Sequence, residues 1–338
     1  SQRTALFMET AMNKQCQVSG VRCQSKKSKL INTYWSMVTF VLMFTVYCLL
    51  LIGCGGAQTP TLSAVNLRAI EYNQNATKAL ENGDYEKALA YYMEALKVNR
   101  SIENTEGIAV NLINMAVLYQ KKGNTSNAHE FVDIAFSMPD ISNDIRSDAA
   151  YEKARIYLKG KNTAKAKEWV DKSLSLDKGL REGSRWNLMG RISFAEGKYD
   201  EAAAMANTAL NLNRENKQRA EESNSLRLMA EINAQKGLYS ESRELYKKSL
   251  EIDKELGDSK KIAMTLRGIG MLSLKQGHFQ DAAIFYMRAY DVSSNAGDTE
   301  GTSEALDFMS DAYRKSGDEK KAEEMMKKKA DLEKGKKK

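Results

Sequence analysis

The sequence predicts an all-α protein built from a repeated pair of helices, and three observations carry this prediction. Only two prolines occur in 338 residues, whereas Ala, Leu, Lys and Glu are plentiful, a composition that suits helices and disfavours a β-rich fold. One kind of phrase with a central glycine returns along the chain, and its last three gaps are 40 residues each. Small side chains also recur at fixed places in each phrase. Together these features predict an α-solenoid.

Each phrase predicts a first helix, a turn near a glycine, and a second helix. The seven turn glycines are Gly83, Gly123, Gly160, Gly197, Gly237, Gly277 and Gly317. Glycine permits the positive φ that ends a helix, although Gly160 is one residue out of register. Small residues let crossing helices approach closely, and the first-helix column reads Ala76, Ala116, Ala154, Gly190, Ala230, Gly270 and Ser310. Two further small columns follow each turn, broken only by Lys329, which suits a polar last helix that acts as a cap.

These phrases resemble the tetratricopeptide repeat, and the resemblance covers about 69–334. It implies a right-handed superhelix of about seven helix–turn–helix units, at approximately 69–102, 109–142, 147–180, 183–216, 223–256, 263–296 and 303–334. The period departs from the family, because it is 40 residues in most repeats rather than about 34. The second helix, or the loop after it, is therefore expected to be longer than usual.

Proteins of this family hold ligands on the first helix of each pair, so the resemblance implies a groove for a protein or peptide partner. The matching positions here are Asn73, Val110, Ile113, Asn114, Val117, Tyr151, Arg155, Asn187, Arg191, Phe194, Asn224, Arg227, Arg267 and Met271. Four of them are arginines in repeats three to six, and arginine pairs with carboxylates, which favours an acidic or extended partner. Arginine is also common on exposed helices, so an ordinary solvated surface remains the alternative.

The first 60 residues have the pattern of a secretion signal. Residues 14–29 hold five basic side chains, and 37–52 form a run of sixteen residues without a charge. Leu51, Ile52, Gly53 and Cys54 follow and resemble the lipobox of bacterial lipoproteins. The resemblance implies cleavage before Cys54 and attachment of diacylglycerol and acyl chains to that residue, with no other cofactor. An uncleaved signal anchor, in which Cys54 is incidental, is the alternative.

The expected layout follows from these segments. Residues 1–53 are the signal peptide, within which 1–11 are expected not to be native because Met12 suits the start. Residues 54–68 are the lipidated cysteine and a flexible tether, 69–334 the solenoid, and 335–338 a basic tail. Gly55 stands where an Asp would retain a lipoprotein in the inner membrane, so we expect the outer membrane of a bacterial envelope, facing the periplasm. The inner membrane and the cell surface remain alternatives.

The distribution of charge and of reactive side chains bears on function. The formal charge of +7 gathers at the two ends of the chain, so it does not predict that the body binds nucleic acid. No cysteine follows Cys54, and His129 and His278 lie far apart, which offers no metal spacing. Neither a glycine-rich phosphate loop nor a Gly-x-Ser-x-Gly elbow occurs in the body. We therefore expect neither an enzyme nor a metal site.

These features predict a membrane-anchored scaffold or adaptor that binds a partner protein through its groove. The candidate processes are assembly of a pilus or secretion machine, outer-membrane assembly, and control of cell-wall enzymes. A periplasmic accessory protein that holds a small ligand for a transporter is the alternative from another class, and an enzyme whose site has no recognisable motif is the third.

Overall fold

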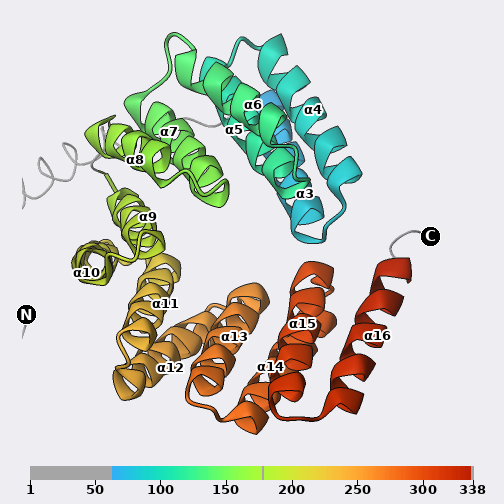
Figure 1. Ribbon diagram of the computed structural model, residues 1–338. Helices are drawn as coiled ribbons and strands as arrows, with labels where there is room; N and C mark the ends of the chain where they lie inside the picture. Colours follow the sequence, from blue (N-terminus) through green and yellow to red (C-terminus); the bar gives the residue numbers. More distant parts are fainter. Residues whose placement is uncertain (1–62, 177–178, 336–338) are drawn as a thin grey trace, which may run out of the picture. The chain divides into compact units, whose positions relative to one another are not determined.

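A computed structural model describes residues 63–176 and 179–335 of the chain, and the regular elements in these ranges are α-helices (Figure 1). The helices are α3 (Ala64–Glu81), α4 (Tyr85–Ser101), α5 (Thr105–Lys121), α6 (Thr125–Ser137), α7 (Asn143–Lys159), α8 (Thr163–Leu176), α9 (Glu182–Ala195), α10 (Tyr199–Glu215), α11 (Arg219–Gln235), α12 (Tyr239–Glu255), α13 (Ser259–Lys275), α14 (Phe279–Asn295), α15 (Thr299–Lys315) and α16 (Glu319–Gly335). The predicted signal peptide, Cys54 and nearly all of the tether lie outside the described residues. None of these helices is long and apolar enough to cross a membrane.

The helices pack as consecutive pairs, α3 with α4 through α15 with α16 (Figure 1). The predicted first-helix column of small residues is buried at every position, from Ala76 to Ser310. At Gly190 an added Cβ would lie 3.3 Å from the backbone oxygen of Ala202, so the two helices of that pair meet almost backbone to backbone. This architecture confirms the predicted all-α solenoid.

Short loops join the helices, and capping side chains begin several of them, so the long period does not come from long loops. Asp84, Asn104, Asp258 and Asp298 each accept a hydrogen bond from a backbone N–H in the first turn of the helix that follows. The segment "SLEIDKE" stays helical to the end of α12, at Glu255. The extra residues of the 40-residue period therefore lie in the helices, and both helices of this pair, α11 and α12, are 17 residues long.

The expected left-handed glycine turn is correct for six of the seven repeats and wrong for the third. Gly83, for example, has a φ of 77°, whereas Gly160 has a φ of −76°. In that repeat Lys161 takes the left-handed conformation instead, with a φ of 60°. The single-residue shift of Gly160 explains the difference, because the turn keeps its place relative to α8 while the glycine does not.

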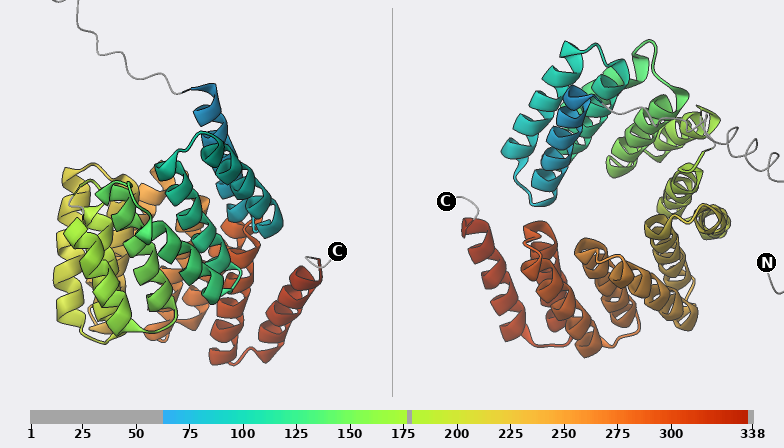
Figure 2. Two further views of the ribbon diagram at one scale, coloured as in Figure 1. Left: turned by 90° about the horizontal axis from the view of Figure 1, so that it is seen from above. Right: turned by 180° about the vertical axis from the view of Figure 1, so that it is seen from behind.

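The first helices of the pairs lie on the inner side of the curve. Each first helix contacts the first helix of the next pair, as α11 contacts α13, whereas the second helices that the structure describes make no such contact with one another. A stack that is closer on one side bends toward that side. Figures 1 and 2 show α7, α9, α11, α13 and α15 on the inner side and α8, α10, α12 and α14 outside.

An ion pair joins segments that are far apart in the sequence. Lys121 Nζ, on α5, lies 3.6 Å from Glu300 Oε2, on α15. A cavity of about 430 Å³ lies beside this ion pair, between residues 80–85 and 298–300. None of the predicted groove residues lines this cavity.

Candidate functional site

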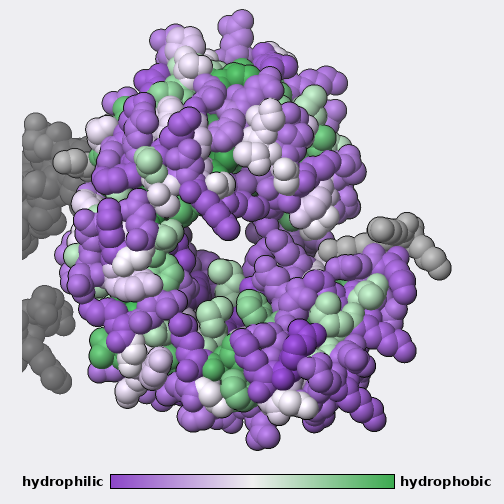
Figure 3. Space-filling view, in the orientation of Figure 1, coloured by the Kyte–Doolittle hydropathy of each residue, from purple (hydrophilic) through white to green (hydrophobic). Residues whose placement is uncertain are grey.

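The inner face carries two cavities that are lined mainly by first helices. The larger, of about 490 Å³, lies among α9, α11, α12, α13 and α15, and four predicted residues line it: Phe194, Arg227, Arg267 and Met271. The smaller, of about 450 Å³, lies among α5, α7, α9 and α11, and five predicted residues line it: Val110, Ile113, Asn114, Tyr151 and Arg155. Figure 3 shows a hollow at the centre of the visible face, with hydrophobic residues along part of its edge.

The five other predicted residues line neither cavity, and most of them hold helices together. Asn73 accepts a hydrogen bond from Asn111 Nδ2 at 2.6 Å, which links α3 to α5. Val117 is half-buried and packs against the core of the first two pairs. Asn187 is buried and donates to Ser225 Oγ at 3.3 Å. The ligand contact expected at Asn187 stays a prediction, and the side chain is directed toward α11.

Each of the four predicted arginines lies within ion-pair distance of a carboxylate of this chain. The pairs are Arg155 Nη1 with Glu152 Oε1 at 2.7 Å, Arg191 Nη1 with Glu231 Oε2 at 3.5 Å, Arg227 Nη1 with Asp253 Oδ2 at 2.9 Å, and Arg267 Nη2 with Glu304 Oε2 at 2.9 Å. Two of these pairs join neighbouring first helices, α9 to α11 and α13 to α15. The charges of these arginines are consequently already balanced by carboxylates of this chain. They give little support to the expectation of a strongly acidic partner.

Arg227 departs furthest from its predicted role. Its side chain is 3% exposed and that of Asp253 is fully buried. Thr265 also donates to Asp253 Oδ2, at 2.8 Å, so the carboxylate joins α11, α12 and α13. Burial lowers the pKa of Arg227, and the charge of Asp253 opposes this shift. The ligand contact expected at Arg227 stays a prediction, because the residue lines the larger cavity while its guanidinium pairs with Asp253 between two repeats.

The smaller cavity has charged walls around one tyrosine. Burial raises the pKa of Tyr151 to about 12, and the Arg155 guanidinium lies 5.9 Å from the centre of its ring. Glu152 raises the pKa of Arg155. Arg185 also lines this cavity and was not among the predicted residues. Its side chain is 1% exposed, and its Nη2 lies 3.2 Å from Asp148 Oδ1. Arg185 is not at one of the first-helix positions that the repeat predicts to bind ligands. Its partner Asp148 is 37 residues earlier, so the sequence does not show that the two residues meet.

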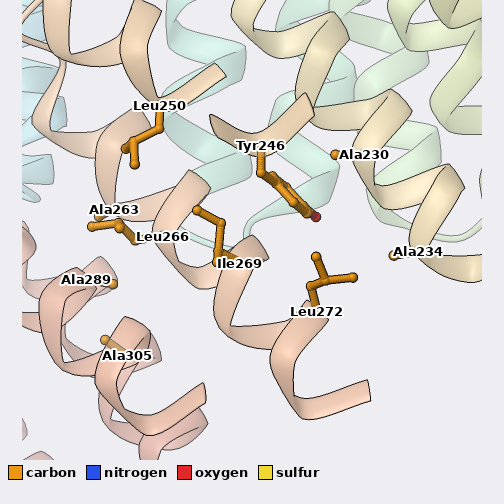
Figure 4. Close-up of a cluster of buried hydrophobic side chains, with 10 residues drawn as sticks. All are labelled: Ala230, Ala234, Tyr246, Leu250, Ala263, Leu266, Ile269, Leu272, Ala289 and Ala305. Carbon is orange, nitrogen blue, oxygen red and sulfur yellow. The ribbon is translucent and has the colours of Figure 1, made fainter. Parts of the chain in front are cut away.

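The larger cavity is more apolar, and several of its lining residues were not predicted: Tyr246, Met264, Gly268, Lys275 and Phe308. Figure 4 shows the Tyr246 ring between the helix that carries Ala230 and Ala234 and the helix that carries Ile269 and Leu272. The segment "RGIG" makes room for two such rings. An added Cβ at Gly268 would lie 2.5 Å from the Tyr246 ring, and one at Gly270 would lie 2.5 Å from the Tyr286 ring. Met264 and Met271 are exposed and lie two helical turns apart on α13, and this spacing in the sequence could have indicated the cavity.

In 63–176 and 179–335, no three His, Cys, Asp or Glu side chains gather where they could hold a metal ion. The larger cavity combines apolar surface with a few polar groups, which is the usual composition of a binding site, whereas polar and charged side chains form most of the lining of the smaller one.

Comparison with known proteins places the helix pairs in one family. A tetratricopeptide-repeat model matches residues 68–135, 184–255, 220–295 and 261–328, and a second model of the same repeat matches 147–179. No curated protein matches this sequence. A solved Rap protein, complexed with competence and sporulation factor, is 12% identical with a TM-score of 0.59, over 79% of this chain and 76% of that one.

Two further solved structures have a similar fold. The apo form of RapI is 13% identical with a TM-score of 0.57, over 79% of this chain and 97% of RapI. The apo form of the quorum sensor NprR from B. thuringiensis is 17% identical with a TM-score of 0.51, over 79% of this chain and 77% of NprR. At these identities the similarity concerns the fold alone.

Proposed function

Because this chain belongs to the tetratricopeptide-repeat family, we propose that it is a lipid-anchored adaptor that holds an extended segment of a partner protein in its inner groove. The observation that carries the proposal is the position of the two cavities. Both lie on the face formed by the first helices, and α9 and α11 contribute to both. A partner that reaches both cavities crosses several repeats, which suits an extended chain.

The character of the cavities supports peptide binding over catalysis. Each offers apolar surface beside hydrogen-bonding groups, and Asn114 and Tyr151 in the smaller cavity can bond to a peptide backbone. The Rap protein of similar fold was solved with competence and sporulation factor, which is a property of that protein and supports groove binding here by analogy.

The anchor is proposed from the sequence, because Cys54 lies outside the described residues. The segment "LIGC" follows a charged stretch and an apolar run in the order of a lipoprotein signal. Several acyl chains on one residue give stable attachment, whereas a single chain gives only marginal attachment. We place the adaptor in a bacterial envelope, at the periplasmic side of the outer membrane, in assembly of a pilus or secretion machine, of the outer membrane, or of cell-wall enzymes.

Substitution of Cys54 tests the anchor. The Cys54→Ala variant is expected to leave the membrane fraction, because no acyl chain can be attached. The matched control is Cys48→Ala, six residues earlier, which is expected to fractionate like the wild type. If Cys54→Ala stays in the membrane fraction, the uncleaved signal anchor is the better account.

Crosslinking in intact cells, followed by mass spectrometry, tests the adaptor role. We expect crosslinks between lysines of the first helices and one envelope protein that belongs to an assembly machine. Recovery of no protein partner, together with a small molecule that stays bound during purification, would contradict the proposal.

One observation favours a second candidate, a small-ligand accessory protein for a transporter. The larger cavity has a volume of about 490 Å³, which is within the usual range for small-molecule sites of about 300–1,000 Å³. Native mass spectrometry of the purified protein separates the two functions. A bound small molecule supports the accessory role, and a ligand-free mass together with peptide binding supports the adaptor.

A further inference from the structure

We infer that the larger cavity is the specificity pocket of the groove, and that it takes one large apolar side chain of a peptide whose nearby carboxylate lies against Lys275. This inference rests on the proposed function and specifies the class of peptide that the groove selects. Three observations support the inference: the residue that forms the floor of the cavity, the residues that form its walls, and the pairing of the charged residues that line it.

The floor of the cavity is the ring of Tyr246, which packs directly against a glycine of α13. Gly268 lies on α13, where an added Cβ would be 2.5 Å from the ring of Tyr246. The ring itself is buried, at 3% exposure, so its face closes the bottom of the cavity against α11. An aromatic floor suits an apolar side chain, because such a group loses little by leaving water there.

The walls combine flexible and fixed apolar groups. Met264 and Met271, both on α13, are 40% and 41% exposed. Methionine has three rotatable bonds and adapts to ligands of different shape. Phe308 stands opposite on α15 and is held by a stacked ring contact with Tyr286, with 5.2 Å between ring centres. An entering apolar side chain would cover surface that water now contacts.

Pairing within the protein neutralises nearly all of the charges that line the cavity. Three lining acids each have a cation at ion-pair distance: Glu231 with Arg191 at 3.5 Å, Glu304 with Arg267 at 2.9 Å, and Asp307 with Lys329 at 2.6 Å. The lining cation Arg227 is likewise paired with Asp253.

Lys275 is the exception among the lining residues. Its Nζ donates to the neutral side-chain oxygen of Gln235 at 3.0 Å, and none of the ion pairs found in 63–176 and 179–335 includes it. In addition, Arg267 Nη1 is buried without a hydrogen-bond partner among the described residues, so Glu304 does not use all of its donors. The unbalanced charge at this cavity is therefore positive, and a single carboxylate complements it.

Helix geometry sets the spacing between the apolar side chain and the carboxylate. Met271 and Lys275 are four residues apart on one face of α13, which corresponds to about 6 Å along the helix axis. An extended peptide advances about 3.3 Å per residue, and alternate side chains point to the same side. The two groups are thus about two residues apart in the peptide, and the carboxylate is either an Asp or Glu side chain or the C-terminus.

Selection from random peptides tests the inference on the full-length protein in detergent. The probes are bead-bound nine-residue random peptides, prepared with either a free C-terminal acid or an amide. We expect the wild type to enrich peptides with a large apolar residue about two positions from a carboxylate. Enrichment in both preparations identifies an Asp or Glu side chain, and enrichment confined to the free acids identifies the C-terminus.

Two variants and two matched controls show which cavity is responsible. Met271→Lys is expected to reduce enrichment of these peptides about tenfold. Lys275→Glu is expected to select peptides that keep the large apolar residue but carry Lys or Arg in place of the carboxylate. The controls are Met93→Lys on α4 and Lys248→Glu on α12, which change exposed residues of second helices and are expected to select as the wild type does.

Two results separate failure of this inference from failure of the proposed function. If peptides are enriched but Met271→Lys and Lys275→Glu select the same ones as the wild type, the groove binds peptides elsewhere and the inference is wrong. If no peptide is enriched by any form of the protein, the proposed groove function is wrong and the inference falls with it.

Discussion

At the scale of the residue, Arg227 and Asp253 show how much a side chain's role depends on a distant partner. The position of Arg227 on the first helix predicted that it faces inward, and it does line the larger cavity. Its partner lies 26 residues later, at the end of α12. The column pattern places a side chain on a helix face, but it does not say which group the neighbouring helix presents there. This is why the fold was predictable while the role of Arg227 was not.

The buried ion pair predicts a large loss of stability when its acid is removed. Asp253→Ala leaves the Arg227 guanidinium buried without a counter-charge, which is expected to cost about 3–5 kcal/mol. Urea unfolding followed by circular dichroism measures the change. The double substitution Arg227→Met with Asp253→Leu is expected to recover much of this loss, because both charges are gone.

The matched control for this prediction is Asp291→Ala on α14, where the aspartate is exposed. It is expected to change the free energy of unfolding by less than about 0.5 kcal/mol. Equal effects of Asp253→Ala and Asp291→Ala would show that the buried pair is not important for stability. The same pair makes Arg227→Glu an unsuitable test of ligand binding, because it would bury two carboxylates together.

At the scale of the element, the sequence predicts the features that recur in every repeat and does not predict the features that occur in one repeat alone. The small columns are a local property that returns every repeat, so they predicted the helix pairs well. The position of the third turn was missed because Lys161, not Gly160, takes the left-handed conformation. The larger cavity was half predicted: the inward positions of α13 gave Arg267 and Met271, but Gly268 and Tyr246 meet only when α12 packs on α13.

The packing of the last helix, α16, lets us predict the effect of removing it. Its buried residues are Ala322 and Met325, and Met325 packs in one cluster with Leu306 and Met309 of the preceding helix. Removal of residues 319–338 is expected to cost about 1.5–3 kcal/mol for each large side chain that it uncovers. It is also expected to cause self-association, because an apolar face becomes exposed.

Thermal unfolding and size-exclusion chromatography measure the two effects of this truncation. The control is removal of 336–338 alone, which lie outside the described residues and are expected to leave both readouts unchanged. A monomer with wild-type stability after loss of 319–338 would contradict the capping role of α16.

At the scale of the whole molecule, buried tyrosines predict how stability changes at high pH. Burial raises the pKa of Tyr151 from 10.0 to about 12 and also raises the pKa values of Tyr246 and Tyr286. The unfolded chain therefore releases these protons at lower pH than the folded chain does. Their stabilisation is complete below pH 10 and is lost as the pH rises toward and beyond 12.

A titration that follows helix content and tyrosinate absorbance together checks this expectation. Helix content is expected to fall above pH 10, while part of the tyrosinate signal appears only with unfolding. If all tyrosines ionise near their ordinary pKa while the helices stay intact, the burial of these side chains is contradicted.

The central claim is that the inner groove, and not the outer face, holds a partner protein. A photo-reactive amino acid placed at Met271 in intact cells tests this most directly, with Met93 on α4 as the outer-face position because both methionines are well exposed. The account predicts that illumination joins the Met271 form to one defined protein and leaves the Met93 form without that adduct. Adducts from Met93 alone, or no adduct from Met271 in cells that contain the folded protein, would contradict it.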